Sequence, residues 1–219
     1  MSSPNRDDWE IPVEYLVLHY TAVDLQDTLA IFMKPGGVIS AHLVIDRDGS
    51  IYELVDCLEG KTLRGRHSGP SQWLQGEKLK EQFNDFSIGI ELVNYNGNIF
   101  PFTDEQYSTL TWIVNKLQRH YPALNDPGRI VGHEHIAGFR GKADPGLCFD
   151  WPRFYQDCFP EQLAPLRTSV CPNELQRSLM NFQEQEPRGN KERSKYWQAV
   201  SHITETSIKL INEAKNSAQ

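Results

Sequence analysis

The chain has 219 residues, an apolar fraction of 39% and a formal net charge of −7 with its seven histidines neutral. This length and composition suit one globular domain of ordinary size with an appendage, and they exclude a chain that is disordered throughout. The negative charge argues against nucleic acid and anionic membranes as general partners, and no apolar run approaches the roughly 18 residues of a membrane-spanning helix.

The first part of the chain contains three short runs typical of strands. Residues 14–20, with the core YLVLHY, predict a buried strand that carries His19 at its C-terminal end. Residues 38–45 and 51–55 are two further apolar runs, and the Asp-Gly pair between them is a strong turn signal. We therefore predict that these two runs form a β-hairpin.

A fourth predicted strand contains an acidic residue. Residues 88–93 read IGIELV, so Glu91 interrupts an otherwise apolar strand. Burial normally excludes a carboxylate, and one that is buried has either paired with a cation or been retained for function. Glu91 is therefore a candidate functional residue.

A helix and a short strand follow. Thr103 and Gln106 form a capping-box pattern, and apolar residues then recur at helical spacing for about five turns, ending near Pro122. Residues 129–132 predict a short strand that delivers His133. Beyond it we expect a loop, because four residues that break regular structure follow closely: Gly138, Gly141, Pro145 and Gly146.

The composition changes after about residue 165. Glycine nearly vanishes, and residues 173–185 and 192–214 show helical periodicity. A helical pair this short is not expected to be stable alone. We therefore predict a domain at residues 1–164 and a helical C-terminal extension at 165–219 that packs on it.

Five residues suggest one chemical site: His19, Glu91, His133, Lys142 and Asp144. Each alone has an ordinary structural explanation, such as a hydrogen-bonded histidine or a turn aspartate. Together, two imidazoles and a carboxylate leave one position of a tetrahedral zinc ion open for water. Glu91 could then act as general base on that water and Lys142 could stabilise an oxyanion, which is the chemistry that amide hydrolysis needs.

Other polar residues compete for these roles. His135 is the second choice as a ligand, because a strand would point it to the same face as His133. His42 is expected to be a packed, hydrogen-bonded residue, and His67 to line a substrate groove. Arg64 and Arg66 could supply positive charge for substrate carboxylates, or could be ordinary solvated side chains.

Six strings closely resemble, in order, those of the type 2 N-acetylmuramoyl-L-alanine amidase family, which is related to phage amidase lysozymes and animal peptidoglycan recognition proteins. The match spans roughly residues 15–151. Any one string is weak evidence, but the ordered set is highly specific. The strings are LHYTA (18–22), SAHLVIDRDG (40–49), HSG (67–69), NDFSIGIEL (84–92), GHEHIAG (132–138) and KADPG (142–146).

The resemblance implies an α/β fold with a central mixed sheet flanked by helices. It also implies one zinc ion held by His19, His133 and Asp144, with Glu91 as base and Lys142 on the transition state. Asp144 stands where the phage and animal relatives usually have cysteine, so the bacterial branch fits better. The loop before Lys142 is longer than in the bacterial enzymes and lacks their proline.

Substrate contacts are expected from His67, Arg66 and Asn84, the last being the first residue of the NDFSIGIEL string. The implied reaction is hydrolysis of the amide between the lactyl group of N-acetylmuramic acid and L-alanine of the stem peptide. The substrate would be either polymeric peptidoglycan or soluble anhydromuropeptides. A different reading is a recognition module that binds peptidoglycan without cutting it, although such a module would lack a ligand or the base.

The start of the chain and its cysteines bear on the compartment. The first 14 residues lack a secretory pattern, so we expect a cytoplasmic monomer if Met1 is the native start, and a periplasmic or envelope protein if a signal has been removed. Cys57, Cys148, Cys158 and Cys171 show no CxxC spacing. A disulfide such as Cys158 to Cys171 is expected only after export, and a cysteine nucleophile lacks any local signature.

Overall fold

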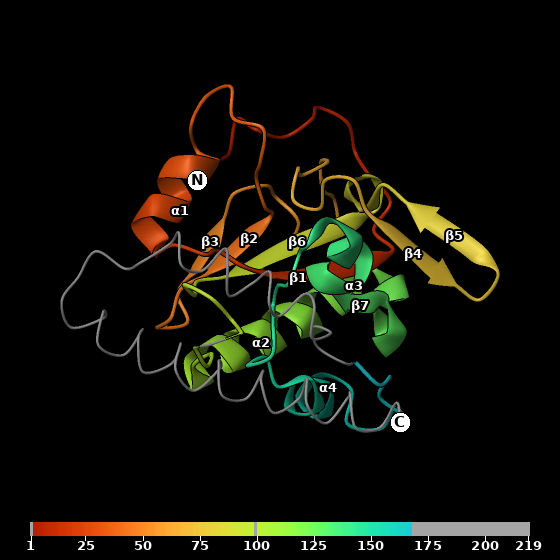
Figure 1. Cartoon of the computed structure of the whole chain (residues 1–219). Helices are drawn as coiled ribbons and strands as arrows, with labels where there is room; N and C mark the ends of the chain where they lie inside the picture. The colour runs from red at the N-terminus through yellow and green to blue at the C-terminus, as the bar shows by residue number, and fades with distance from the viewer. Residues whose placement is uncertain (1, 99, 168–219) are drawn as a thin grey trace, which may run out of the picture.

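The structure is a computed structural model that describes residues 2–98 and 100–167 (Figure 1). The two helices predicted at 173–185 and 192–214 lie outside the described residues, and so does Cys171. Among the cysteines that are described, Cys57, Cys148 and Cys158 are free thiols. No helix in the described ranges has the length and apolar character that crossing a bilayer would require.

The centre of the fold is a five-stranded mixed sheet in the order β3-β2-β6-β1-β7. Neighbouring strands run parallel except for the antiparallel hairpin of β2 and β3. A separate antiparallel hairpin, β4–β5, projects from one side (Figure 1). The strands are β1 (Tyr15–Tyr20), β2 (Leu43–Ile45), β3 (Ile51–Glu53), β4 (Gln72–Gln75), β5 (Lys78–Glu81), β6 (Ser87–Leu92) and β7 (Ile130–Gly132).

Helices cover both faces of the sheet, which confirms the predicted fold class. α2 and α4 pack on one face, whereas α1 and α3 pack on the other (Figure 1). The helices are α1 (Leu25–Phe32), α2 (Asp104–His120), α3 (His133–Ala137) and α4 (Trp151–Cys158). Short 3-10 turns occupy Phe83–Asp85, Pro122–Asn125, Pro127–Arg129 and Gly138–Arg140.

Strand alternation decides which side chains reach the site. In β1, Leu16 and Leu18 join the core beneath α2 and α4, so His19 extends toward the opposite face. In β6, Ile88 and Ile90 join the same core, so Glu91 also extends away from it. His19 and Glu91 are register partners on adjacent parallel strands, so the two polar side chains emerge side by side.

The helix predicted from the capping box is present as α2. The Thr103 side chain accepts a hydrogen bond from the Gln106 backbone N–H, and the Gln106 side chain accepts one from the Thr103 backbone N–H. α2 ends at His120, just before Pro122. This start and end confirm the prediction.

Two predicted boundaries are wrong. The first strand of the hairpin begins at Leu43 rather than at residue 38, because Val38 and Ile39 border a groove instead of pairing, with 78% and 46% of their surface exposed. The loop predicted after His133 is in fact a helix, α3, followed by a 3-10 turn. The breakers that indicated a loop act only from Gly138 onward.

Candidate metal centre

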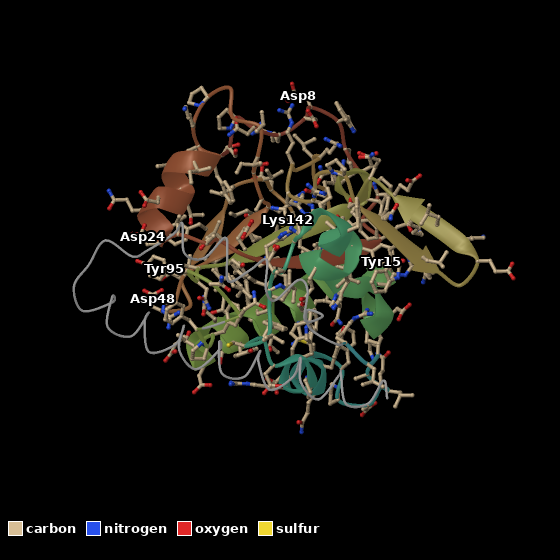
Figure 2. All side chains as sticks on the ribbon, viewed as in Figure 1. Asp8, Tyr15, Asp24, Asp48, Tyr95 and Lys142 are labelled. Carbon is tan, nitrogen blue, oxygen red and sulfur yellow. The ribbon has the colours of Figure 1, made fainter. Side chains whose placement is uncertain are left out.

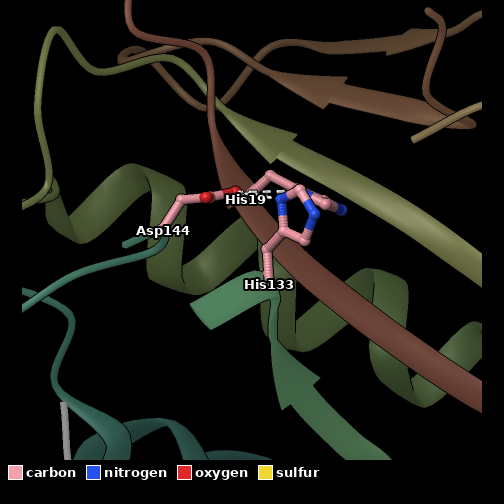
Figure 3. Close-up of side chains that lie close together, drawn as sticks. All are labelled: His19, His133 and Asp144. Carbon is pink, nitrogen blue, oxygen red and sulfur yellow. Dashed lines mark hydrogen bonds and ion pairs between the residues drawn. The ribbon is translucent and has the colours of Figure 1, made fainter. Parts of the chain in front are cut away.

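Three buried side chains from distant parts of the chain converge at the C-terminal edge of β1 (Figure 3). Asp144 Oδ2 lies 2.8 Å from His19 Nδ1 and 3.0 Å from His133 Nδ1, and the two Nδ1 atoms are 3.1 Å apart. The exposed fractions of His19, His133 and Asp144 are only 1%, 3% and 8%. The structure therefore brings together the three residues that were predicted as metal ligands.

The local fold explains this convergence. β1 and β7 are parallel neighbours, and Leu18 pairs with Gly132, so the residues that follow each of them, His19 and His133, reach the same edge. Asp144 is held from behind, because its backbone carbonyl accepts a hydrogen bond of 2.9 Å from the N–H of Glu134 in α3. Three separate segments thus supply one side chain each.

The donor set fits a small divalent ion. Tetrahedral zinc with bonds of about 2.0–2.1 Å needs ligand atoms about 3.3 Å apart. The observed separations of 2.8–3.1 Å are slightly tighter than this. Two imidazole nitrogens and one carboxylate oxygen also match the ligands of catalytic zinc sites, which leave a further position for water.

The electrostatics of the cluster suit metal binding. Burial, reinforced by the neighbouring His133, lowers the pKa of His19 to about 4, so this imidazole stays neutral near pH 7. Burial opposes ionisation of Asp144, but His133 and His19 outweigh it and hold the pKa of that carboxyl far below its usual range. A neutral imidazole and an ionised carboxylate are the forms that ligate a metal.

Glu91 faces the same space but has no hydrogen bond through Oε2 to any described residue. It is buried, with 8% of its surface exposed. Burial, followed by the nearby negative charge of Asp144, raises the pKa of Glu91 to about 8. An interior carboxyl with a pKa near neutrality is suited to gain and lose a proton during a reaction.

The cluster lies in a cavity of about 260 Å³ that is also lined by Glu91 and Lys142. A second cavity of about 240 Å³ adjoins it and shares Ile39, Arg66 and Lys142. Lys142 is exposed, and Figure 2 shows it beside α3. The two cavities form a groove with the histidines and Lys142 near its middle.

The three residues predicted to contact substrate lie along this groove in different settings. His67 is buried on the floor, and its Nδ1 is 3.1 Å from His19 Nε2. Arg66 lines both cavities and forms an ion pair with Asp7. Asn84 is buried, and its Oδ1 accepts the backbone N–H of His67 and of Ser68.

The two rival histidines take no part in the cluster. His42 is buried and hydrogen-bonded, as predicted, but it lies just before β2 rather than within a strand; its Nε2 contacts the Leu63 carbonyl and its Nδ1 accepts the N–H of Gly89. His135 Nδ1 accepts the N–H of Gly132. The second-choice ligand is therefore not in the cluster, because a helix rather than a strand follows His133.

Two further residues, one that lines the groove and one that binds two of its arginines, were not identified from the sequence. Arg140 lines the second cavity and its Nη2 donates a hydrogen bond of 2.7 Å to the Ser68 carbonyl. Asp7 forms ion pairs with both Arg64 and Arg66. Neither residue stands in one of the six strings, and contacts across such sequence separations leave no local pattern. A mixed sheet that carries a buried His-His-Asp cluster beside an interior glutamate has the donor set that could hold a metal ion for hydrolysis.

Comparison with known proteins narrows this class. Residues 9–147 match the N-acetylmuramoyl-L-alanine amidase family, and the chain belongs to that family. The 1,6-anhydro-N-acetylmuramyl-L-alanine amidase AmpD of Haemophilus influenzae is 42% identical over 116 residues, which are 53% of this chain and 56% of the relative. N-acetylmuramoyl-L-alanine amidase AmiD of Escherichia coli is 30% identical over 158 residues, covering 66% and 52%. The matches thus span about half the length of these relatives.

Solved structures share the fold. A crystal structure of a selenomethionine AmpD derivative superposes with a TM-score of 0.58 and 32% identity, covering 72% of this chain and 92% of that one. AmpDh3 from Pseudomonas aeruginosa has the same TM-score at 25% identity, with coverage of 84% and 72%. These likenesses confirm the predicted mixed sheet with flanking helices.

Proposed function

We propose that this chain is a zinc-dependent amidase that hydrolyses the amide between the lactyl group of N-acetylmuramic acid and L-alanine of the stem peptide. The observation that carries the proposal is the convergence of His19, His133 and Asp144 on one point, with Glu91 facing the same cavity. Membership of the amidase family supports the choice of bond.

The metal is proposed to be one zinc ion held by His19, His133 and Asp144. Zinc bound there would lower the pKa of a bound water toward neutrality and polarise the scissile carbonyl. Imidazole and carboxylate ligands with an open position are the usual catalytic zinc set.

Glu91 and Lys142 are proposed to act on the reacting atoms. Glu91 takes a proton from the attacking water and passes it to the leaving amine of L-alanine, a role supported by its place in the same cavity as the cluster. Lys142, on the cavity rim, stabilises the negative charge that develops on the carbonyl oxygen.

The substrate is proposed to be a soluble anhydromuropeptide rather than polymeric wall. The relatives that are 42% identical carry the name 1,6-anhydro-N-acetylmuramyl-L-alanine amidase, whereas the match to AmiD is weaker. Arg66 and Arg140 along the second cavity are suited to bind the carboxylates of a stem peptide. The compartment and the monomeric state stay predictions.

The test compares two substrates and one variant. Zinc-loaded protein is incubated with soluble anhydromuropeptides and, separately, with intact sacculi, and the released stem peptide is quantified by chromatography and mass spectrometry. We expect faster release from the soluble fragments. Glu91→Gln should keep its zinc yet lose about 10²- to 10⁴-fold in turnover, the loss expected when a general base is removed.

Two results would contradict the proposal. If the zinc-loaded wild type binds anhydromuropeptide but releases no stem peptide, the chain is a recognition module. If Glu91→Gln releases peptide as fast as wild type, Glu91 is not the base.

A further inference from the structure

We propose that His67 is a positioning residue whose ring, together with the carbonyl of Ser68, holds both ligand imidazoles from the side away from the metal. This inference rests on the zinc site of the proposed function and assigns His67 a task other than substrate contact. Backbone carbonyls can only accept hydrogen bonds, so an imidazole nitrogen that faces a carbonyl must carry the ring hydrogen.

The carbonyl of Ser87 determines which nitrogen of His67 carries the hydrogen, and His67 in turn determines this for His19. His67 Nε2 lies 3.2 Å from this oxygen, so Nε2 carries the hydrogen and Nδ1 keeps its lone pair. The Ser68 hydroxyl, 3.0 Å away, is a second donor that can only share that single lone pair. His19 Nε2, at 3.1 Å, must then also be a donor, which leaves His19 Nδ1 as the bare nitrogen facing Asp144.

The ring of His133 is oriented by the backbone of Ser68, the residue that follows His67. His133 Nε2 lies 2.9 Å from the carbonyl of Ser68, so it too carries its hydrogen there and leaves Nδ1 bare. Both Nδ1 lone pairs therefore converge with Asp144 Oδ2 within 3.1 Å. Three acceptors at this separation repel one another unless a metal ion, or a proton on one of the imidazoles, lies between them.

The segment that sets this arrangement is itself held firmly. Asn84 Oδ1 accepts the N–H of His67 at 3.0 Å and that of Ser68 at 2.8 Å. Gly89 in β6 makes room for the imidazole, since a Cβ added there would lie 2.3 Å from His67 Cγ. Arg140 Nη2 binds the Ser68 carbonyl from the groove side. The position of His67 is therefore specified from several sides.

The test uses two variants at His67 with zinc affinity as the readout. His67→Phe keeps a ring of similar size but cannot accept the hydrogen of His19 Nε2, whereas His67→Asn can place an amide oxygen where Nδ1 lies. Competition with a chromophoric chelator gives the dissociation constant. We expect His67→Phe to bind zinc about 10- to 100-fold more weakly, and His67→Asn to recover most of that loss.

His42→Phe is the matched control. His42 is also buried, and its ring centroid lies 5.5 Å from that of His67, but neither of its nitrogens bonds to a ligand residue. This variant should keep the zinc affinity of wild type within about threefold, well below the roughly 10- to 100-fold loss expected when an outer-shell contact is removed. Wild-type affinity in His67→Phe, or no recovery in His67→Asn, would overturn the inference.

A second measurement needs no substitution. Long-range proton–nitrogen correlation spectra of the zinc-loaded wild type should show hydrogen on Nε2 of His19, His67 and His133, and a bare Nδ1 on His67. Hydrogen on Nδ1 of His67, or zinc bound through Nε2 of either ligand, would refute it. Because affinity and cleavage are measured separately, a zinc-binding protein that cuts nothing would count against the proposed function alone.

Discussion

Glu91 is a residue whose ionisation the fold opposes. Its pKa rises from the usual 4.5 to about 8, chiefly through burial. Between these two values the folded state keeps a proton that the unfolded state releases, so the unfolded state binds fewer protons. The contribution of Glu91 to the free energy of unfolding therefore falls as the pH rises through this window.

Glu91→Gln isolates this effect, because the amide stays neutral at every pH. In metal-free protein we expect the variant to gain stability relative to wild type between pH 5 and pH 9. Each pKa unit corresponds to about 1.4 kcal/mol, so the gain should be on the order of a few kcal/mol. Urea unfolding at both pH values measures it, and an equal difference between the proteins at the two values would show that Glu91 titrates normally.

Most residues of the candidate site could be predicted because each one stands out against its own neighbours in the sequence. Glu91 interrupts an apolar strand, His19 is the penultimate residue of β1 and His133 directly follows β7, so each leaves a signal within a few positions. The bond between His67 and His19 joins residues 48 positions apart, and no spacing rule indicates it. His67 was consequently predicted only as a groove residue.

At the scale of elements, the cap of α2 offers a test of how sequence signals stabilise the frame. Thr103 Oγ1 accepts from the Gln106 N–H at 3.1 Å and donates to the Arg47 carbonyl at 2.7 Å. Thr103→Ala removes both contacts and should lower the free energy of unfolding by about 1–2 kcal/mol. Urea denaturation measures the change.

Ser108→Ala, at an exposed position of the same helix, is the control and should change stability by no more than about 0.5 kcal/mol. If Thr103→Ala falls within that same range, the cap contributes little and the fold is held by the packing of α2 alone.

Elements with strong periodicity were predicted well, and short ones were not. β1, β6 and α2 combine long apolar patterns with clear ends. α3 has only five residues, too few for helical periodicity to be recognised. The β4–β5 hairpin was also missed, because its paired Leu74 and Leu79 are 66% and 54% exposed and Trp73 alone among its apolar residues packs against a buried cluster.

At the scale of the whole molecule, charge is distributed unevenly. The chain carries a net charge of −7, yet four cationic side chains line the second cavity beside the metal cluster. They are Arg64, Arg66, Arg140 and Lys142. Asp7 neutralises part of this charge through Arg64 and Arg66, whereas Arg140 bonds to a backbone carbonyl. A local basic groove in an acidic protein suits a small anionic fragment.

The proposed activity requires a zinc ion bound by His19, His133 and Asp144, and removal of that ion is the most direct test. Cleavage of a soluble anhydromuropeptide is measured before chelation, after exhaustive chelation with metal loss verified by elemental analysis, and after stepwise return of zinc. We predict that cleavage falls to background and returns fully at one zinc per chain. Undiminished cleavage by protein shown to be free of metal would contradict the account.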